Sequence, residues 1–142
     1  MKSLLILLVF VFAATFAFDP VFVDELREIV DDKKDAKELK KLDHDDNMKR
    51  SEKKKKLDEI LNKQPENIKK LYKIEVERSK LLHQIKMDKK LEKVTEQELK
   101  DHLKKEEEIN NDMNISEKEA DKKKDELRSK LTSKQRKSLK KD

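Results

Sequence analysis

The chain contains no glycine in 142 residues, and this absence limits its fold more than any other feature. Tight hairpin turns usually need a residue at positive φ, a conformation that glycine adopts without steric cost. Only two prolines and no tryptophan are present, whereas lysine, glutamate and leucine, which all favour helices, are abundant. The sequence therefore predicts an all-α protein.

The first 17 residues have the features of a secretory signal peptide. Lys2 precedes the unbroken apolar run 4–12, and Thr15 and Ala17 place small residues at positions −3 and −1 of a cleavage site. A membrane anchor is the alternative, but the apolar segment is only about 15 residues long, shorter than the ~20 that span a bilayer. We expect residues 18–142 to be secreted into the extracellular space, with no transmembrane segment left after cleavage.

The composition of the secreted part favours a folded protein with a small core. Leu, Ile, Val and Phe make up about 22% of residues 18–142, just above the ~20% below which disorder is expected. The 37 Lys and Arg nearly balance the 32 Asp and Glu, whereas disordered chains usually carry a large net charge. Since there is no cysteine, stability must come from helix packing, charge pairs, a ligand or a partner chain.

Cap residues and apolar spacing predict about six helices in a compact bundle. The expected helix starts are Asp19-Pro20, Ser51, Pro65, Thr95, Ser116 and Thr132. The longest helix is expected over residues 66–93, with a core stripe of Ile68, Leu71, Ile74, Leu81, Leu82 and Ile85. A long coiled coil is the alternative architecture, but heptads do not continue past Pro65 or across the later caps.

Two polar stretches of similar sequence recur 65 residues apart. DHDDNMKRSEKK, residues 43–54, aligns with EINNDMNISEKE, residues 108–119, and each lies between two predicted helices. A helix, a twelve-residue polar loop and a second helix make up an EF-hand. The alignment predicts two degenerate EF-hand-like units around the long central helix, paired across Ile115 at the eighth loop position.

The second loop offers oxygen ligands for a divalent cation. Calcium, for example, binds six to eight oxygens. Its ligand positions are occupied by Glu108, Asn110, Asp112, Asn114 (through its carbonyl), Ser116 and Glu119. Met113 replaces the glycine that the turn normally requires. The first loop has Asp43, Asp45, Asn47 and Ser51, but Lys54 stands where a bidentate glutamate is needed. We expect weak calcium or magnesium binding in the second loop only.

A helix cap explains part of the same pattern without a metal. Ser116 and Glu119 have the spacing of a capping box, and Asn and Asp are ordinary loop residues. Both interpretations stay open. Asn114-Ile115-Ser116 is also an N-glycosylation sequon, and a loop that uses the Asn114 carbonyl leaves its side chain free for sugar.

These stretches resemble the secreted SXP/RAL antigens of nematodes, over roughly residues 24–139. The resemblance rests on YKIEVERSKLLHQIK (72–86), INNDMNISEKEADKKKDEL (109–127) and LTSKQRKSL (131–139). It implies a single all-helical, allergen-like cation-binding domain over residues 18–142, with a cation site on Asp112, Ser116 and Glu119. The chain departs from the family in lacking a central Trp and Gly and in its longer charged region, residues 33–56.

Enzymatic and nucleic-acid functions have little support. His44, His83 and His102 lie in separate segments, and there is neither a cysteine for zinc nor a glycine-rich loop for phosphate. The runs 53–56 and 134–141 are basic, but acidic residues are interspersed along the chain, so solvated helix faces are expected.

The sequence therefore predicts a non-enzymatic, antigen-type binding protein with one weak cation site. Its basic end, residues 134–142, is expected to contact anionic surfaces. The alternatives are a structural or interaction protein with an unknown host or parasite partner, and a lipid carrier. A carrier needs apolar surface beyond that of its core, and little is available here.

Overall fold

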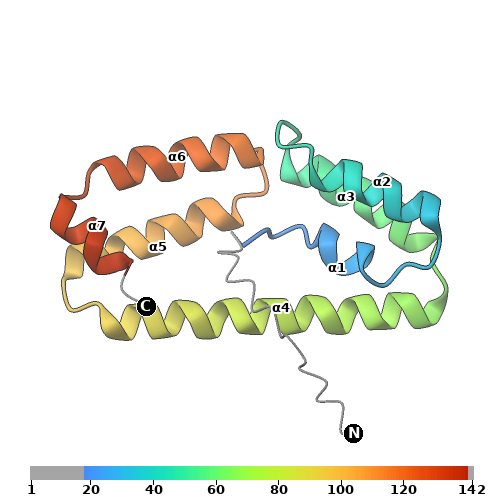
Figure 1. Ribbon diagram of the computed structural model, residues 1–142, viewed down its shortest axis with the longest axis horizontal. Helices are drawn as coiled ribbons and strands as arrows, with labels where there is room; N and C mark the ends of the chain where they lie inside the picture. The colour runs from blue at the N-terminus through green and yellow to red at the C-terminus, as the bar shows by residue number, and fades with distance from the viewer. Residues whose placement is uncertain (1–17, 141–142) are drawn as a thin grey trace, which may run out of the picture.

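The computed structural model describes residues 18–140, so the predicted signal peptide, residues 1–17, lies outside the described part of the chain. Within residues 18–140 the protein forms seven helices and no strand (Figure 1). They are α1 (Val23–Arg27), α2 (Lys33–Asp43), α3 (Arg50–Asn62), α4 (Glu66–Lys93), α5 (Gln97–Asn111), α6 (Glu117–Ser129) and α7 (Ser133–Leu139). The predicted all-α class is confirmed.

Helix α4 runs along the whole molecule, and the other six helices lie on one side of it (Figure 1). Helices α1, α2 and α3 stand over its first half, and α5, α6 and α7 stand over its second half (Figure 1). Helices α2 and α3 form one helix–loop–helix unit, and α5 and α6 form the other. Because residues 44–49 and 112–116 interrupt the helices, a single continuous coiled coil is excluded.

The apolar core consists of two separate clusters. The larger one joins the first four helices and contains Val21, Phe22, Val23, Leu26, Leu39, Leu42, Leu57, Ile60, Ile68 and Tyr72. The smaller one lies between α5 and the chain end and contains Val94, Leu99, Leu103 and Leu131. Two small clusters agree with the low apolar content. Met113 of the second loop packs against the larger cluster, and polar contacts add to this connection between the two units.

The first helix begins later than its sequence signals predict. The Asp19 carboxylate accepts a hydrogen bond from the Val21 N–H group at 2.9 Å, which forms a turn instead of a cap. Phe22 follows in the left-handed conformation, with φ of 59°, and α1 starts at Val23. Such a conformation is uncommon for a bulky residue, and here burial of the Phe22 side chain in the larger cluster stabilises it.

The charged segment after α1 forms a helix of its own, α2, for which no separate start was predicted between Asp19-Pro20 and Ser51. The Asp32 carboxylate caps α2 by accepting hydrogen bonds from the N–H groups of Lys34 and Asp35. Leu39 and Leu42 are thereby carried into the core. The cap explains why α2 forms despite its high charge.

Besides Asp19, two further predicted caps are wrong, and two are confirmed. Ser51 lies inside α3, which begins at Arg50, and α5 begins at Gln97 without a side-chain cap from Thr95. Ser116 and Thr132 both form complete capping boxes. The N–H group of Ser51 instead donates to the Met113 carbonyl of the other unit, so a tertiary contact replaces the local cap.

Helix α4 has its predicted bounds, but it buries a different face from the predicted one. Of the predicted core stripe only Ile68 is buried, whereas the other five residues are exposed: Leu71, Ile74, Leu81, Leu82 and Ile85. The inward face begins with Ile68 and Tyr72, and Val76, Met87 and Leu91 continue it with partly buried side chains packed on the two clusters. Between them the Ser79 hydroxyl donates to Glu25 at 2.7 Å, and the His83 ring stacks on Phe18 with their centroids 3.8 Å apart. The sequence prediction fails because α4 buries this mixed face and not the face with the most large aliphatic residues.

Candidate functional site: the joint between the two loops

The two loops meet near the centre of the molecule and pair through their backbones. The Arg50 N–H group donates to the Ile115 carbonyl at 3.0 Å, and the Ser51 N–H group donates to the Met113 carbonyl at 2.8 Å. Lys49 and Ser116 form an isolated antiparallel bridge. Arg50 and Ile115 both occupy the eighth position of their aligned loops, so the loops pair at the predicted position. We call residues 44–50 and 109–117 the loop joint.

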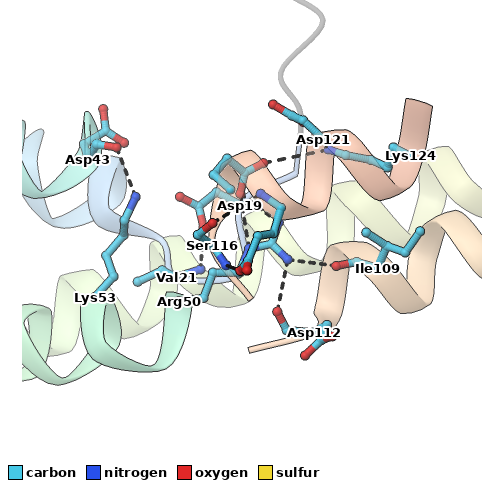
Figure 2. A network of polar contacts seen from close by, with 12 residues as sticks. Asp19, Val21, Asp43, Arg50, Lys53, Ile109, Asp112, Ser116, Asp121 and Lys124 are labelled. Atoms are coloured by element: carbon cyan, nitrogen blue, oxygen red, sulfur yellow. Dashed lines mark hydrogen bonds and ion pairs between the residues drawn. The ribbon is translucent and has the colours of Figure 1, made fainter. Parts of the chain in front are cut away.

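The side chain of Arg50 fills the second loop from the first unit. Its residue is 1% exposed, the lowest value of any charged residue in the described chain. Nη1 donates to the carbonyl oxygens of Ile109 and Asp112, at 2.8 and 3.1 Å (Figure 2). Nε and Nη2 donate to one carboxylate oxygen of Glu117, at 3.2 and 2.7 Å. One carboxylate and two carbonyls therefore neutralise and orient this buried cation.

The network continues from Glu117 along α6. Lys124 Nζ lies 3.8 Å from Glu117 and 2.9 Å from Asp121 (Figure 2). Lys124 is largely buried, while Asp121 is exposed. The Glu117 carboxylate is thus shared by two cations, Arg50 and Lys124.

A second buried cation, Lys53, closes the first loop. Its residue is 3% exposed, and Nζ donates to the Asp43 carbonyl at 3.1 Å (Figure 2). The pKa of the Asp43 carboxyl is raised, first by burial and then by the nearby Asp24 carboxylate. Burial also raises the pKa of Asp19, and its bond from the Val21 N–H group opposes that shift.

Arg50 and Lys53 were not among the predicted site residues, although their spacing from Leu57 indicates that they are buried. They precede Leu57 by seven and four residues, so they lie on the helical stripe that Leu57 and Ile60 bury. The prediction that the whole 53–56 lysine run forms a solvated face is wrong at Lys53. A basic residue aligned with a core stripe, next to a polar loop, is the signal that identifies both.

The six residues of the predicted metal site lie in different local environments. Helix α5 continues through Asn111, so Glu108 and Asn110 are helical, and Glu108 is exposed. The Asp112 carboxylate accepts a hydrogen bond from the Asn114 N–H group at 2.9 Å and lies 3.8 Å from Lys123 Nζ. Glu108 and Asn110 therefore do not share the turn that Asp112 and Asn114 form.

Ser116 and Glu119 are engaged in the capping box of α6. Ser116 Oγ accepts from the Glu119 N–H group at 3.2 Å, and Glu119 Oε2 accepts from the Ser116 N–H group at 2.8 Å. The bond from the Ser116 backbone lowers the pKa of Glu119. Among residues 18–140, no three His, Asp or Glu side chains converge in a metal-binding group. Cation binding at this loop stays a prediction.

A surface cavity of about 560 Å³ lies beside α1, α4 and the first loop. Eight carboxylate residues line it, against four apolar ones: Phe18, Phe22, Val23 and Leu82. Sites for apolar ligands are lined mainly by hydrophobic side chains. This cavity therefore does not favour the lipid-carrier alternative.

Comparisons with known protein families, curated proteins and solved structures find no match to this chain. The resemblance to the SXP/RAL antigens, with the secretion and cation binding that it implies, stays a prediction. No helix of residues 18–140 combines the length and apolar character that crossing a membrane requires.

Proposed function

We propose that this chain is a secreted, non-enzymatic helical protein of the antigen type that acts by contacting other macromolecules. In this proposal the loop joint is a structural element that does not depend on a metal ion. The observation that carries it is the position of Arg50, which supplies a positive charge to the oxygens of the second loop. The chain thus provides the cation that an EF-hand takes from solution.

Arg50 and a divalent ion would compete for the interior of this loop. An ion placed there would meet a buried guanidinium, and like charges repel strongly where water is excluded. Moving Arg50 out would leave Glu117 and two carbonyls without their donor. Breaking a buried ion pair by removing one partner costs about 3–5 kcal/mol, which a weak extracellular site cannot easily offset.

Calorimetry on residues 18–142 tests the proposal directly. Calcium and magnesium are titrated separately to about 5 mM, because extracellular sites bind with Kd values near 10⁻⁴–10⁻³ M. We expect no binding heat for either ion and an unchanged melting temperature. Saturable heat that the Glu119→Gln variant abolishes would reject the metal-independent joint.

Weak cation binding through residues 108–119 is the second candidate, and one observation favours it. The lowered pKa of Glu119 keeps this exposed carboxylate ionised, next to the loop that holds Asp112 and Asn114. Binding would draw Glu119 away from the Ser116 N–H group. The same calorimetry decides between the candidates, and Asp112→Asn should then weaken binding as Glu119→Gln does.

The basic end of the chain offers a further contact with anionic surfaces. Lys134, Arg136 and Lys137 are exposed on α7. Retention of residues 18–142 on a heparin column tests this contact. Elution below about 0.1 M salt, where screening is still weak, would count against it.

A further inference from the structure

The outward face of α4 is apolar and has no helix of the described chain packed on it. In residues 18–140 the exposed large hydrophobic residues all lie on this helix: Leu71, Ile74, Leu81, Leu82 and Ile85. Their exposed fractions run from 40% to 62%. We call these five residues the α4 stripe. Leu82 lies at the edge of the stripe, where it also lines the cavity beside α1.

The stripe is not needed for folding of the single chain. The opposite face of α4 already supplies Ile68 and Tyr72 to the larger core cluster. The largest apolar patch on a typical monomer, about 300–600 Å², is often a functional surface. Its spacing at residues 71, 74, 81 and 85 follows the a and d positions of a heptad repeat, the pattern of a helix that pairs with another helix.

We infer that the α4 stripe is a self-association surface that pairs with the α4 stripe of a second copy in an antiparallel, twofold-symmetric dimer. This inference specifies a partner within the proposed function and rests on it. The order of the stripe favours a second copy over an unrelated partner. Counted from Arg78, apolar residues stand at −7, −4, +4 and +7, namely Leu71, Ile74, Leu82 and Ile85.

Such a palindrome is self-complementary when a twofold axis passes beside Arg78. Leu71 then faces Ile85 of the second copy, and Ile74 faces its Leu82. A twofold interface requires this reciprocity, since the same surface contributes to both sides. A partner of unrelated sequence would not require the symmetry.

The twofold axis places Arg78 beside Arg78 of the second copy, and Glu75 of each chain offsets this repulsion between like charges. Arg78 lies 3.2 Å from Glu75 in the same chain and is 70% exposed, so it can also reach Glu75 of a second copy. Lys70 precedes the stripe and Asp88 follows it, and both are exposed. An antiparallel pairing brings the Lys70 end of each copy to the Asp88 end of the other.

The apolar area of the stripe is small for a specific interface. The five residues expose roughly 450 Å² per chain, so two copies would bury at most about 900 Å² through them, below the ~1,000 Å² that a specific interface clears. Flanking side chains such as Arg78 and Lys70 would add to this area. We therefore expect a weak dimer that dissociates on dilution.

Sedimentation equilibrium of residues 18–142, from about 1 to 500 µM, tests the association. The weight-average mass should rise from that of one chain towards that of two. Ile74→Lys, which places a charge opposite Leu82 of the second copy at a residue 59% exposed, should keep the chain monomeric without unfolding it. Gln84→Lys, which adds the same charge to the same helix outside the stripe, should still dimerise. A monomer at all concentrations, or equal behaviour of the two variants, overturns the inference.

Cysteine crosslinking tests the orientation, because the natural chain has no cysteine. Leu71→Cys and Ile85→Cys variants, mixed under mild oxidation, should form a disulfide between one copy of each. Either variant alone should crosslink poorly. Fast crosslinking of Leu71→Cys alone would indicate a parallel pair and overturn the inference. None of these outcomes depends on calcium, so a failed dimer leaves the metal-independent joint to be judged by calorimetry.

Discussion

The guanidinium of Arg50 and the carboxylate of Glu117 lie 2.7 Å apart, although 67 residues separate them in the sequence. Arg50 is the first residue of α3, and Glu117 is the first residue of α6, so their contact joins the second helices of the two units. The planar guanidinium also reaches two carbonyls, which a lysine ammonium on a flexible stem would not do in the same geometry. The contact therefore fixes the relative position of two units that have separate apolar clusters.

Replacing Arg50 should destabilise the protein strongly. Arg50→Ala leaves the Glu117 carboxylate and two carbonyls without their buried donor, and we expect a loss of about 3 kcal/mol in the free energy of unfolding. Urea unfolding followed by circular dichroism measures the loss. Arg50→Lys should recover only part of it.

Arg128→Ala is the matched control for this substitution. Arg128 also pairs with a glutamate, Glu106 at 3.6 Å, but its side chain is 53% exposed. An exposed pair contributes about 0–1 kcal/mol, so this variant should unfold close to the natural chain. Equal losses for the two arginines would mean that Arg50 has no special structural role.

The stabilisation that the α6 capping box provides should decrease at acid pH. Because its folded-state pKa is lowered, Glu119 adds stability above its ordinary pKa of 4.5, and this contribution disappears as pH falls through the folded-state value. Glu119→Gln keeps an acceptor for the Ser116 N–H group but has no charge to titrate. Urea midpoints at pH 7 and pH 3 should therefore differ less in this variant than in the natural chain.

Ser116→Ala should destabilise the protein at every pH. It removes the acceptor for the Glu119 N–H group, and loss of such a cap costs about 1 kcal/mol. The same urea series measures it. A variant that is as stable as the natural chain at pH 7 would show that the box does not hold α6 in place.

His102 should make the protein less stable as the solution becomes mildly acidic. Burial lowers the pKa of His102, against the weaker upward effect of Glu106, while Lys105 and Arg128 lower it further. Below the ordinary value of 6.5 the unfolded chain binds a proton that the folded chain does not, so stability falls until pH reaches the folded-state pKa. His102→Phe should remove this part of the pH dependence between pH 7 and pH 5, measured by thermal unfolding. A larger slope in the variant would contradict the assignment.

Local signals predicted the helices well, and long-range contacts explain most of the failures. The bounds of α4 and the boxes at Ser116 and Thr132 depend on neighbouring residues, so the sequence alone predicts them. The cap at Ser51 fails because its N–H group bonds to Met113, 62 positions along the chain. The prediction of which α4 face is buried also fails, because five large apolar residues of α4 are exposed.

The orientation of α4 can be tested by two leucine substitutions. Leu57→Ala removes a fully buried side chain of α3 and should cost about 2–5 kcal/mol. Leu81→Ala changes an exposed residue and should cost less than about 0.5 kcal/mol when it is measured at a concentration too low for dimers. A large loss of stability for Leu81→Ala would mean that Leu81 is buried, as the sequence predicts.

Tyr72, the only tyrosine of the chain, reports on the same orientation from the inward face. Its pKa is raised above the ordinary value of 10, first by burial and then by the carboxylates of Glu25, Asp58 and Asp19. The folded chain therefore holds this proton at a pH where the unfolded chain has lost it, and stability falls as pH rises above 10. Phenolate absorbance at 295 nm should appear near pH 10 in urea and only at higher pH in buffer. Because no other tyrosine contributes, coincident titrations would show that Tyr72 faces solvent and that α4 is turned round.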